Sequence, residues 1–113
     1  MKANRSNRPA RRNDGRIIGT FDGTTLRLKR KRSKHLFRTL DAWAINLSVL
    51  VRAADAGVER VVVEDTETGE VFEAGLHDIL NYGTVIDHGF GTQLALPLQH
   101  WVRSSALQQR LGI

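Results

Sequence analysis

The chain contains no cysteine. This absence excludes disulfide bonds, thiolate metal sites and a cysteine nucleophile, and it fits a reducing compartment. The sequence also lacks a run of about 18 apolar residues, the length that a membrane-spanning helix needs. No apolar stretch of signal-peptide length follows the basic N-terminus. We therefore expect a cytoplasmic protein without a membrane partner.

Aromatic residues are scarce, at 6% of the 113 residues. No strand-like segment carries the aromatic pattern with which RNP-type sheets read single-stranded RNA, which argues against that class. The length indicates a single domain with one modest core.

Positive charge, in contrast, is concentrated in the first third of the chain. Residues 1–38 hold thirteen of the seventeen Lys and Arg residues and only two acids, Asp14 and Asp22. The remaining residues hold four bases and ten acids. A one-sided basic region is typical of a surface that binds a polyanion, because charge that only maintained solubility would be spread over the domain.

Residues 1–15 contain mainly Asn, Arg, Ser, Pro and Gly, with few apolar side chains to bury. Such a segment cannot fold alone, so we predict a disordered basic tail. A basic tail of this kind can also serve as an arm along a phosphate backbone or in a minor groove.

Residues 16–32, RIIGTFDGTTLRLKRKR, predict a β-hairpin. Asp22-Gly23 between two β-prone runs favours a two-residue type I′ turn, which pairs Phe21 with Thr24 and Gly19 with Leu26. Alternation along the strands then separates two faces. The predicted apolar face carries Ile17, Gly19, Phe21, Leu26 and Leu28; the predicted basic face carries Arg16, Ile18, Thr20, Thr25, Arg27 and Lys29.

This basic face has two interpretations. A two-stranded ribbon can enter the major groove of DNA. Thr25, Arg27 and Lys29 would then read base edges or position the ribbon on the duplex. Alternatively, the charges protect an exposed strand edge from aggregation. Five bases between Arg27 and Arg32, interrupted only by Leu28, exceed what edge protection requires, so we favour binding.

Residues 33–57 predict a helical segment, because Leu40, Trp43, Leu47 and Leu50 recur at steps of three and four. Asn46 could cap a new helix from Leu47, and we expect a break there. The apolar stripe favours core packing for Trp43 over base stacking.

The rest of the body predicts further hairpins. Residues 58–74 form a second hairpin at the centre of the sheet, and residues 75–83 form a short helix that ends at Gly83. Residues 84–102 read as a closing hairpin, in which Pro97 indicates an edge or a bulge and Trp101 closes the core. The expected fold is one small α+β domain over residues 16–102, with a mostly antiparallel sheet built from hairpins, one main helical segment and one short helix. A C-terminal tail follows over residues 103–113.

Metal and catalytic sites have little support in the sequence. The pairs His77-Asp78 and Asp87-His88 match no known ligand spacing, so we expect no metal and no cofactor. Glu64 and Asp65 would suit a metal-dependent nuclease, but neighbours in a strand point to opposite faces. We therefore expect a protein that is not an enzyme.

The favoured function is non-enzymatic binding of nucleic acid, with duplex DNA preferred over RNA and with the arm and hairpin contacting phosphates. The candidate binding residues are Arg11, Arg12, Arg16, Arg27, Lys29, Arg30, Lys31, Arg32, Lys34 and Arg38. An edge-paired homodimer stays open, because ribbon readers are often dimers.

The alternative function is a regulatory adaptor whose acidic and apolar body docks a protein partner, for example around Phe90 and Pro97. Binding of structured RNA and a metal-dependent nuclease are further alternatives. Also open is whether the basic first third contacts the acidic body within the same molecule.

Overall fold

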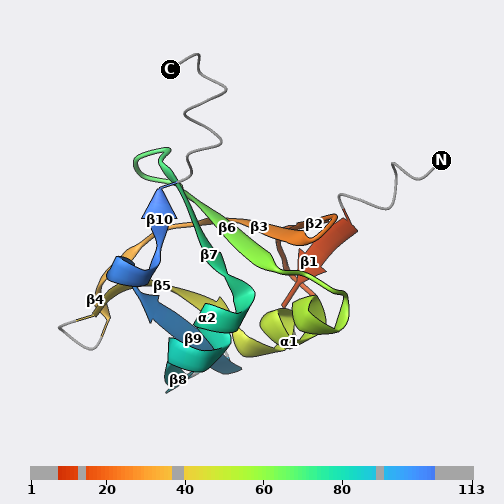
Figure 1. The fold of residues 1–113 in the computed structure, drawn as a ribbon. Coiled ribbons are helices and arrows are strands. Elements are labelled where there is room, and N and C mark those ends of the chain that lie inside the picture. The colour runs from red at the N-terminus through yellow and green to blue at the C-terminus, as the bar shows by residue number, and fades with distance from the viewer. Residues whose placement is uncertain (1–7, 13–14, 37–39, 89–90, 104–113) are drawn as a thin grey trace, which may run out of the picture.

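Two β-sheets face each other, and two helices pack beside the space between them (Figure 1). The computed structural model describes residues 8–12, 15–36, 40–88 and 91–103. The six-stranded sheet has the order β1 (Arg8–Arg11), β2 (Ile17–Asp22), β3 (Thr25–Arg30), β6 (Arg60–Asp65), β7 (Val71–Gly75) and β10 (Val102–Arg103). The four-stranded sheet has the order β4 (Ser33–Leu36), β5 (Leu40–Asn46), β9 (Gly91–Pro97) and β8 (Thr84–His88). The helices are α1 (Leu47–Asp55) and α2 (Leu76–Tyr82), and a short 3-10 turn, η2 (Leu98–His100), follows β9.

The predicted α+β class with mostly antiparallel strands is confirmed, but the prediction of one sheet is wrong. Strand β3 pairs with β6 in parallel, with Thr25 opposite Arg60 and Arg30 opposite Asp65. Parallel neighbours need a crossover connection, and here the crossover contains β4, β5 and α1. This connection supplies two strands of the second sheet. Within the described residues, no helix is long and apolar enough to cross a bilayer.

The predicted hairpin forms, with a shifted register. Asp22 pairs with Thr25, so the loop is Gly23-Thr24, and Gly23 has the positive φ of 62° that the turn needs. Each β2 residue pairs two positions further along β3 than predicted, as for Gly19 and Leu28. Because side chains alternate with a period of two, this shift leaves the two faces of β3 as predicted.

The faces of β2 differ from the prediction at one point. Ala10 of β1 pairs with Gly19, whereas Arg11 pairs with Ile17, so Ile18 is an extra residue in the ladder. Such a bulge reverses the alternation locally. Ile17, predicted to face the core, is therefore 54% exposed, and Ile18 is half-buried and contacts the core at its edge.

The predicted disordered tail through residue 15 is wrong for Arg8–Arg11, which form β1. The edge of β2 offers backbone partners to this segment, and Ala10 is fully buried in the core. Residues 1–7 of the predicted arm lie outside the described residues. At the other end, Val102 and Arg103 pair with Glu73 and Phe72 as β10, while the rest of the predicted C-terminal tail also lies outside them.

The predicted helix over residues 33–57 is correct only from Leu47 onward. Residues 40–46 form β5, in which Trp43 pairs with Leu96 and Ile45 with Leu94 of β9. Trp43 and Ile45 both point inward, so they also fit the two-residue period of a strand. Pairing with the distant strand β9 decides between this period and the helical one. The predicted break at Asn46 is confirmed, since its side chain accepts a hydrogen bond from the Ser48 backbone N–H at 3.1 Å.

The C-terminal half follows the prediction closely. Strand β6 lies near the centre of the six-stranded sheet, paired with β3 and β7, and α2 is followed by Gly83. Pro97 is a correction: it is the last residue of β9, which lies inside the four-stranded sheet and not at its edge. A terminal position lets proline complete an inner strand without interrupting its ladder.

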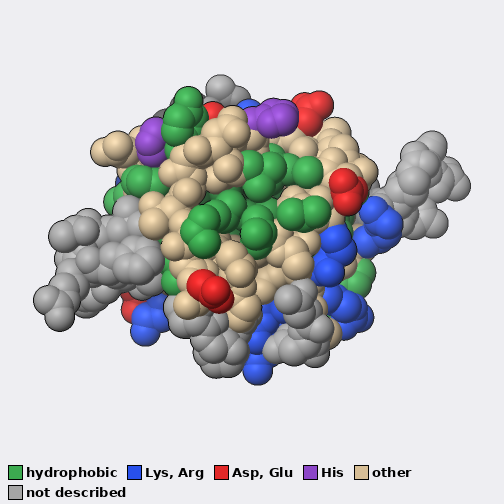
Figure 2. Space-filling model, turned by 90° about the horizontal axis from the view of Figure 1, so that it is seen from below, with side chains coloured by type: hydrophobic (Ala, Val, Ile, Leu, Met, Phe, Trp, Pro, Cys, Tyr) green, Lys and Arg blue, Asp and Glu red, His purple; other side chains and the backbone are tan. Residues whose placement is uncertain are grey.

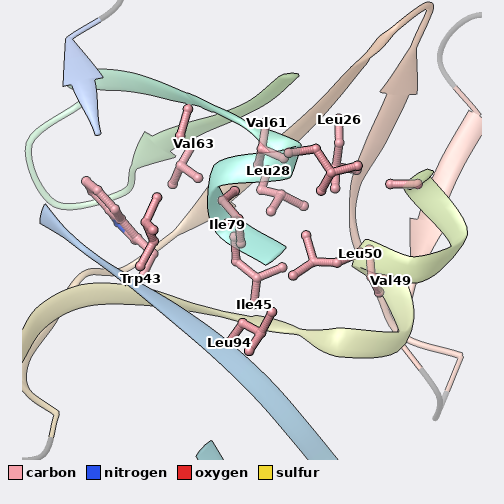
Figure 3. Close-up of a cluster of buried hydrophobic side chains, with 14 of the residues drawn as sticks. Leu26, Leu28, Trp43, Ile45, Val49, Leu50, Val61, Val63, Ile79 and Leu94 are labelled. Carbon is pink, nitrogen blue, oxygen red and sulfur yellow. The ribbon is translucent and has the colours of Figure 1, made fainter. Parts of the chain in front are cut away.

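The core fills the space between the sheets (Figure 3). The six-stranded sheet contributes Leu26, Leu28, Val61 and Val63; the four-stranded sheet contributes Trp43, Ile45, Leu94 and Leu96. The helices add Val49, Leu50, Ala53, Leu76 and Ile79. Core packing of both tryptophans is confirmed.

Trp43, which is fully buried, lies 5.1 Å from both Phe72 and Trp101 between ring centroids. The Trp101 indole N–H donates to the Leu96 carbonyl oxygen at 3.1 Å. The edge-on Trp43–Trp101 contact is one of the favoured aromatic geometries. The aromatic side chains therefore join β5, β7 and the segment after η2.

Gly19 generates a stability prediction. A Cβ atom at Gly19 would lie 2.1 Å from the Arg27 backbone oxygen, whereas one at Gly75 would meet nothing closer than 3.6 Å. We expect Gly19→Ala to lower the free energy of unfolding by about 1–3 kcal/mol, because β2 and β3 must separate. The matched Gly75→Ala should stay within about 0.5 kcal/mol of the wild type in urea unfolding. Equal stability of the two variants would contradict the close approach of β2 to β3.

The cap of α1 generates a second prediction. Asn46 is 3% exposed, and its side-chain oxygen also accepts from the Ser48 hydroxyl at 2.6 Å. We expect Asn46→Ala to cost about 1 kcal/mol in thermal or urea unfolding, because the first turn of α1 loses its acceptor. Asn46→Asp keeps the acceptor and should retain most of the stability. A loss as large as that of Asn46→Ala would show that the amide NH₂ matters more than the cap.

Candidate nucleic-acid interface

Strand β3 presents apolar side chains to the core and basic ones to the outside. Leu26 and Leu28 are 0% and 2% exposed, whereas Arg27 and Lys29 are exposed. The alternation follows from the pleat, since successive side chains point to opposite faces. The outer face of the six-stranded sheet therefore carries the positive charge of β3.

The neighbouring strands extend this outer face. By register, Arg27 lies between Thr20 of β2 and Val62 of β6, and Lys29 lies beside Glu64. Facing neighbours in a sheet have side chains close enough to interact. Basic, hydroxyl and apolar groups therefore share one continuous surface.

This surface contains a hollow of about 770 Å³, which we call the basic hollow. Its basic lining residues are Arg12, Arg16, Arg27, Lys29, Arg30 and Lys31. Its apolar lining includes Ile17, Ile18, Val62 and Val71, and its acidic lining residue is Glu64. Six basic groups against one acidic group make the hollow a site for an anion.

The turn between β1 and β2 brings two of these arginines to the hollow. The Arg12 backbone N–H donates to the Arg16 carbonyl and the Gly15 N–H donates to the Arg12 carbonyl, each at 2.9 Å. Gly15 adopts a φ of 86°, which suits glycine. This tight turn places Arg12 and Arg16 on the lining beside the end of β3.

Arg30 has an unusual electrostatic environment. Burial lowers the pKa of its guanidinium, and the positive charge of Arg12 lowers that pKa further. In the part of the chain that the structure describes, no carboxylate forms an ion pair with Arg30. A half-buried guanidinium beside a like charge gains from a bound anion.

Two other basic residues of the hollow form weak ion pairs. Arg27 Nε lies 3.0 Å from Asp22 Oδ2, and Lys31 Nζ lies 3.5 Å from Glu67 Oε2. The basic side chains are 52% and 72% exposed, so each pair contributes about 0–1 kcal/mol. A polyanion can displace such pairs. The Lys31–Glu67 pair joins the basic first third to the acidic body.

Other acids of the second hairpin pair with bases of the body. Glu73 pairs with Arg60, and Glu70 pairs with Arg103. These pairs reduce the negative charge that β7 would otherwise add near the hollow.

The molecule has a different character on the side of the four-stranded sheet. There, apolar side chains gather at the centre and Lys and Arg lie mainly at the margin (Figure 2). The charge asymmetry of the sequence is thus also an asymmetry in space.

The predicted binding residues divide into two groups. Arg12, Arg16, Arg27, Lys29, Arg30 and Lys31 line the hollow, as given above. Arg11 and Arg32 do not line it; Arg11 lies on β1 and donates to the Gly15 carbonyl at 2.9 Å. Lys34 belongs to β4, but the position of its side chain is not described. Arg38 lies outside the described residues.

The predicted hairpin is not an isolated two-stranded ribbon of the kind that enters a groove. The second edge of β3 is paired with β6, and β1 continues the sheet beyond β2. Burying Leu26 and Leu28 requires this hairpin to be part of the sheet and not to project from it. Thr25, expected on the reading face, lies half-buried at the start of β3.

Sequence reasoning missed the apolar part of the hollow. Val61 and Val63 are fully buried in the core, so Val62 between them must face outward. Three successive valines conceal that alternation. Strand alternation was the available signal: if Val61 and Val63 point inward, Val62 between them has to point outward.

The acidic pair considered for a nuclease is divided between two faces. Glu64 lines the hollow, whereas Asp65 is 3% exposed and accepts from the Glu67 backbone N–H at 2.8 Å. Asp65 therefore holds the turn between β6 and β7. Among the described residues, no three His, Asp or Glu side chains gather in a metal-binding group.

A comparison with protein families, curated proteins and solved structures finds no match to this chain. No residue role can therefore be transferred from a relative.

The environment of Arg30 generates a prediction. Replacing a poorly compensated buried charge with an apolar group of similar size often stabilises a protein. We expect Arg30→Met to raise the free energy of unfolding by about 1 kcal/mol, because desolvation and the repulsion from Arg12 are removed. The exposed and paired Arg27→Met serves as the control and should lose about 0–1 kcal/mol in urea unfolding. A loss of stability in Arg30→Met would mean that the guanidinium is well compensated in the free protein.

Proposed function

We propose that this protein binds nucleic acid without catalysing a reaction, and that the basic hollow holds the phosphates. The observation that carries the proposal is the convergence of six Lys and Arg residues from β3, the position after it and the β1–β2 turn on one hollow. Phosphate oxygens are the natural ligands of such a cluster, because arginine forms two parallel hydrogen bonds to them. Duplex DNA, favoured by the sequence, is the reference polymer.

The width of the sheet limits how DNA would be read. The axes of β2, β3 and β6 together span about 10 Å before side chains are added, and the major groove is about 12 Å wide. A sheet continued on both sides does not fit into a groove of that width. The proposal is therefore restricted to contacts with the phosphate backbone of the nucleic acid. It does not include the reading of bases by a β-ribbon in the groove.

Contacts with the phosphate backbone predict that the affinity for nucleic acid falls steeply as salt rises. Each neutralised phosphate releases counterions, so five contacts give a slope of log affinity against log salt of about −4 to −5. The weak Arg27–Asp22 and Lys31–Glu67 pairs have to open on binding, and their exposure makes that cost small.

A charge-matched pair of variants tests the location of binding. Arg27→Gln/Lys29→Gln/Lys31→Gln removes three charges from the hollow, and Arg8→Gln/Arg11→Gln/Arg52→Gln removes three exposed charges elsewhere. We expect the first variant to lose about tenfold or more in affinity for a labelled duplex at low salt, with a shallower salt slope. The second should lose much less, because long-range attraction alone is screened. Equal losses would sink the proposed location, and a folded first variant with unchanged affinity would sink the function.

The adaptor alternative has one observation in its favour. Val85 of β8 is 62% exposed and Tyr82 at the end of α2 is 61% exposed, on the opposite part of the molecule from the hollow. Phe90, named for this role from the sequence, lies outside the described residues. A partner docked on apolar groups would remain bound at high salt, whereas phosphate-driven binding would weaken.

A further inference from the structure

The basic hollow has an apolar floor that phosphate binding alone does not need. Val62 is 9% exposed but belongs to neither apolar cluster of the interior, because it points to the outer face. By register it lies between Arg27 and Glu73. With Ile18 and Val71 it forms the apolar floor, within the ring of basic residues.

The size of the hollow indicates a ligand that enters it. Its volume of about 770 Å³ lies within the range of small-ligand sites. In a duplex, the faces of the bases are covered by stacking and only their edges are presented in the grooves. Only a base that has left the stack can lay its face on an apolar floor, as flipped bases do between apolar side chains.

The basic groups supply the matching place for a phosphate. Arg30 and Arg12 both line the hollow where the β1–β2 turn meets the end of β3, and no described carboxylate forms an ion pair with Arg30. Two guanidinium groups on one phosphate satisfy several of its oxygens and remove the repulsion between the arginines.

We infer that the basic hollow binds one unpaired nucleotide of a nucleic-acid strand, with its phosphate on Arg30 and Arg12 and its base on the floor of Ile18, Val62 and Val71. This inference rests on the proposed function and specifies the form of the polymer. It favours a single-stranded segment over the duplex that the sequence alone suggested.

The test compares labelled dT₁₂, rU₁₂ and a 12-base-pair duplex by fluorescence anisotropy at one low salt concentration. We expect at least one single strand to bind about tenfold more tightly than the duplex. Comparison of dT₁₂ with rU₁₂ identifies whether the unpaired nucleotide comes from DNA or RNA. Arg30→Met should remove most of this preference, whereas Arg11→Met, which removes the same charge outside the hollow, should retain it.

The floor is tested separately with Val62→Thr, which keeps the shape of the side chain and makes it polar. We expect this variant to bind the single strand about fivefold more weakly and the duplex unchanged. Methyl NMR signals of Ile18, Val62 and Val71 should shift when the single strand binds, because a base ring lies against them.

The outcomes separate the two levels of the proposal. If the duplex binds at least as tightly as both single strands, and Arg30→Met weakens all three polymers equally, the unpaired nucleotide is overturned and the proposed function remains. Absence of binding by all three polymers at low salt overturns the proposed function together with the inference. Methyl shifts confined to residues outside the hollow overturn the assigned floor.

Discussion

The parallel pairing of β3 with β6 determines the arrangement of the rest of the molecule. It moves the basic strand from the edge of a hairpin to the interior of a six-stranded sheet. One side of β3 is then committed to the core through Leu26 and Leu28, and the other is left as a broad outer surface. The crossover that the parallel pairing needs also supplies β5 and α1, which close the core from below. A charged surface and a second sheet thus have the same structural origin.

Local patterns in the sequence determined much of the fold. The Asp22-Gly23 region, the Asn46 cap and Gly83 each act within a few residues, and the hairpin, α1 and α2 were predicted from them. Trp43 shows where local reasoning fails, because its neighbours satisfy both the helical and the strand period. Pairing with Leu96 of β9, more than fifty residues away in the chain, decides for a strand. A single sequence does not reveal such a partner.

The same distinction applies to the basic hollow. Its charged residues were predictable, because Arg27 and Lys29 stand at alternate positions of β3 and Lys31 follows the strand directly. Its floor was not, because Val62 and Val71 reach it through the neighbouring strands β6 and β7. The bulge at Ile18 also exposes Ile17, so that two successive isoleucines line the hollow. Charge can be read from composition, but the shape of a site depends on strand order.

The position of the aromatic side chains has a practical consequence. Both tryptophans of the chain, Trp43 and Trp101, are buried in the core, and neither lines the basic hollow. Their intrinsic emission therefore reports the packing between the sheets, while a dye on a nucleic-acid strand reports occupancy of the outer surface. The two optical signals are spatially separate, so one sample can record denaturation and ligand dissociation as independent events.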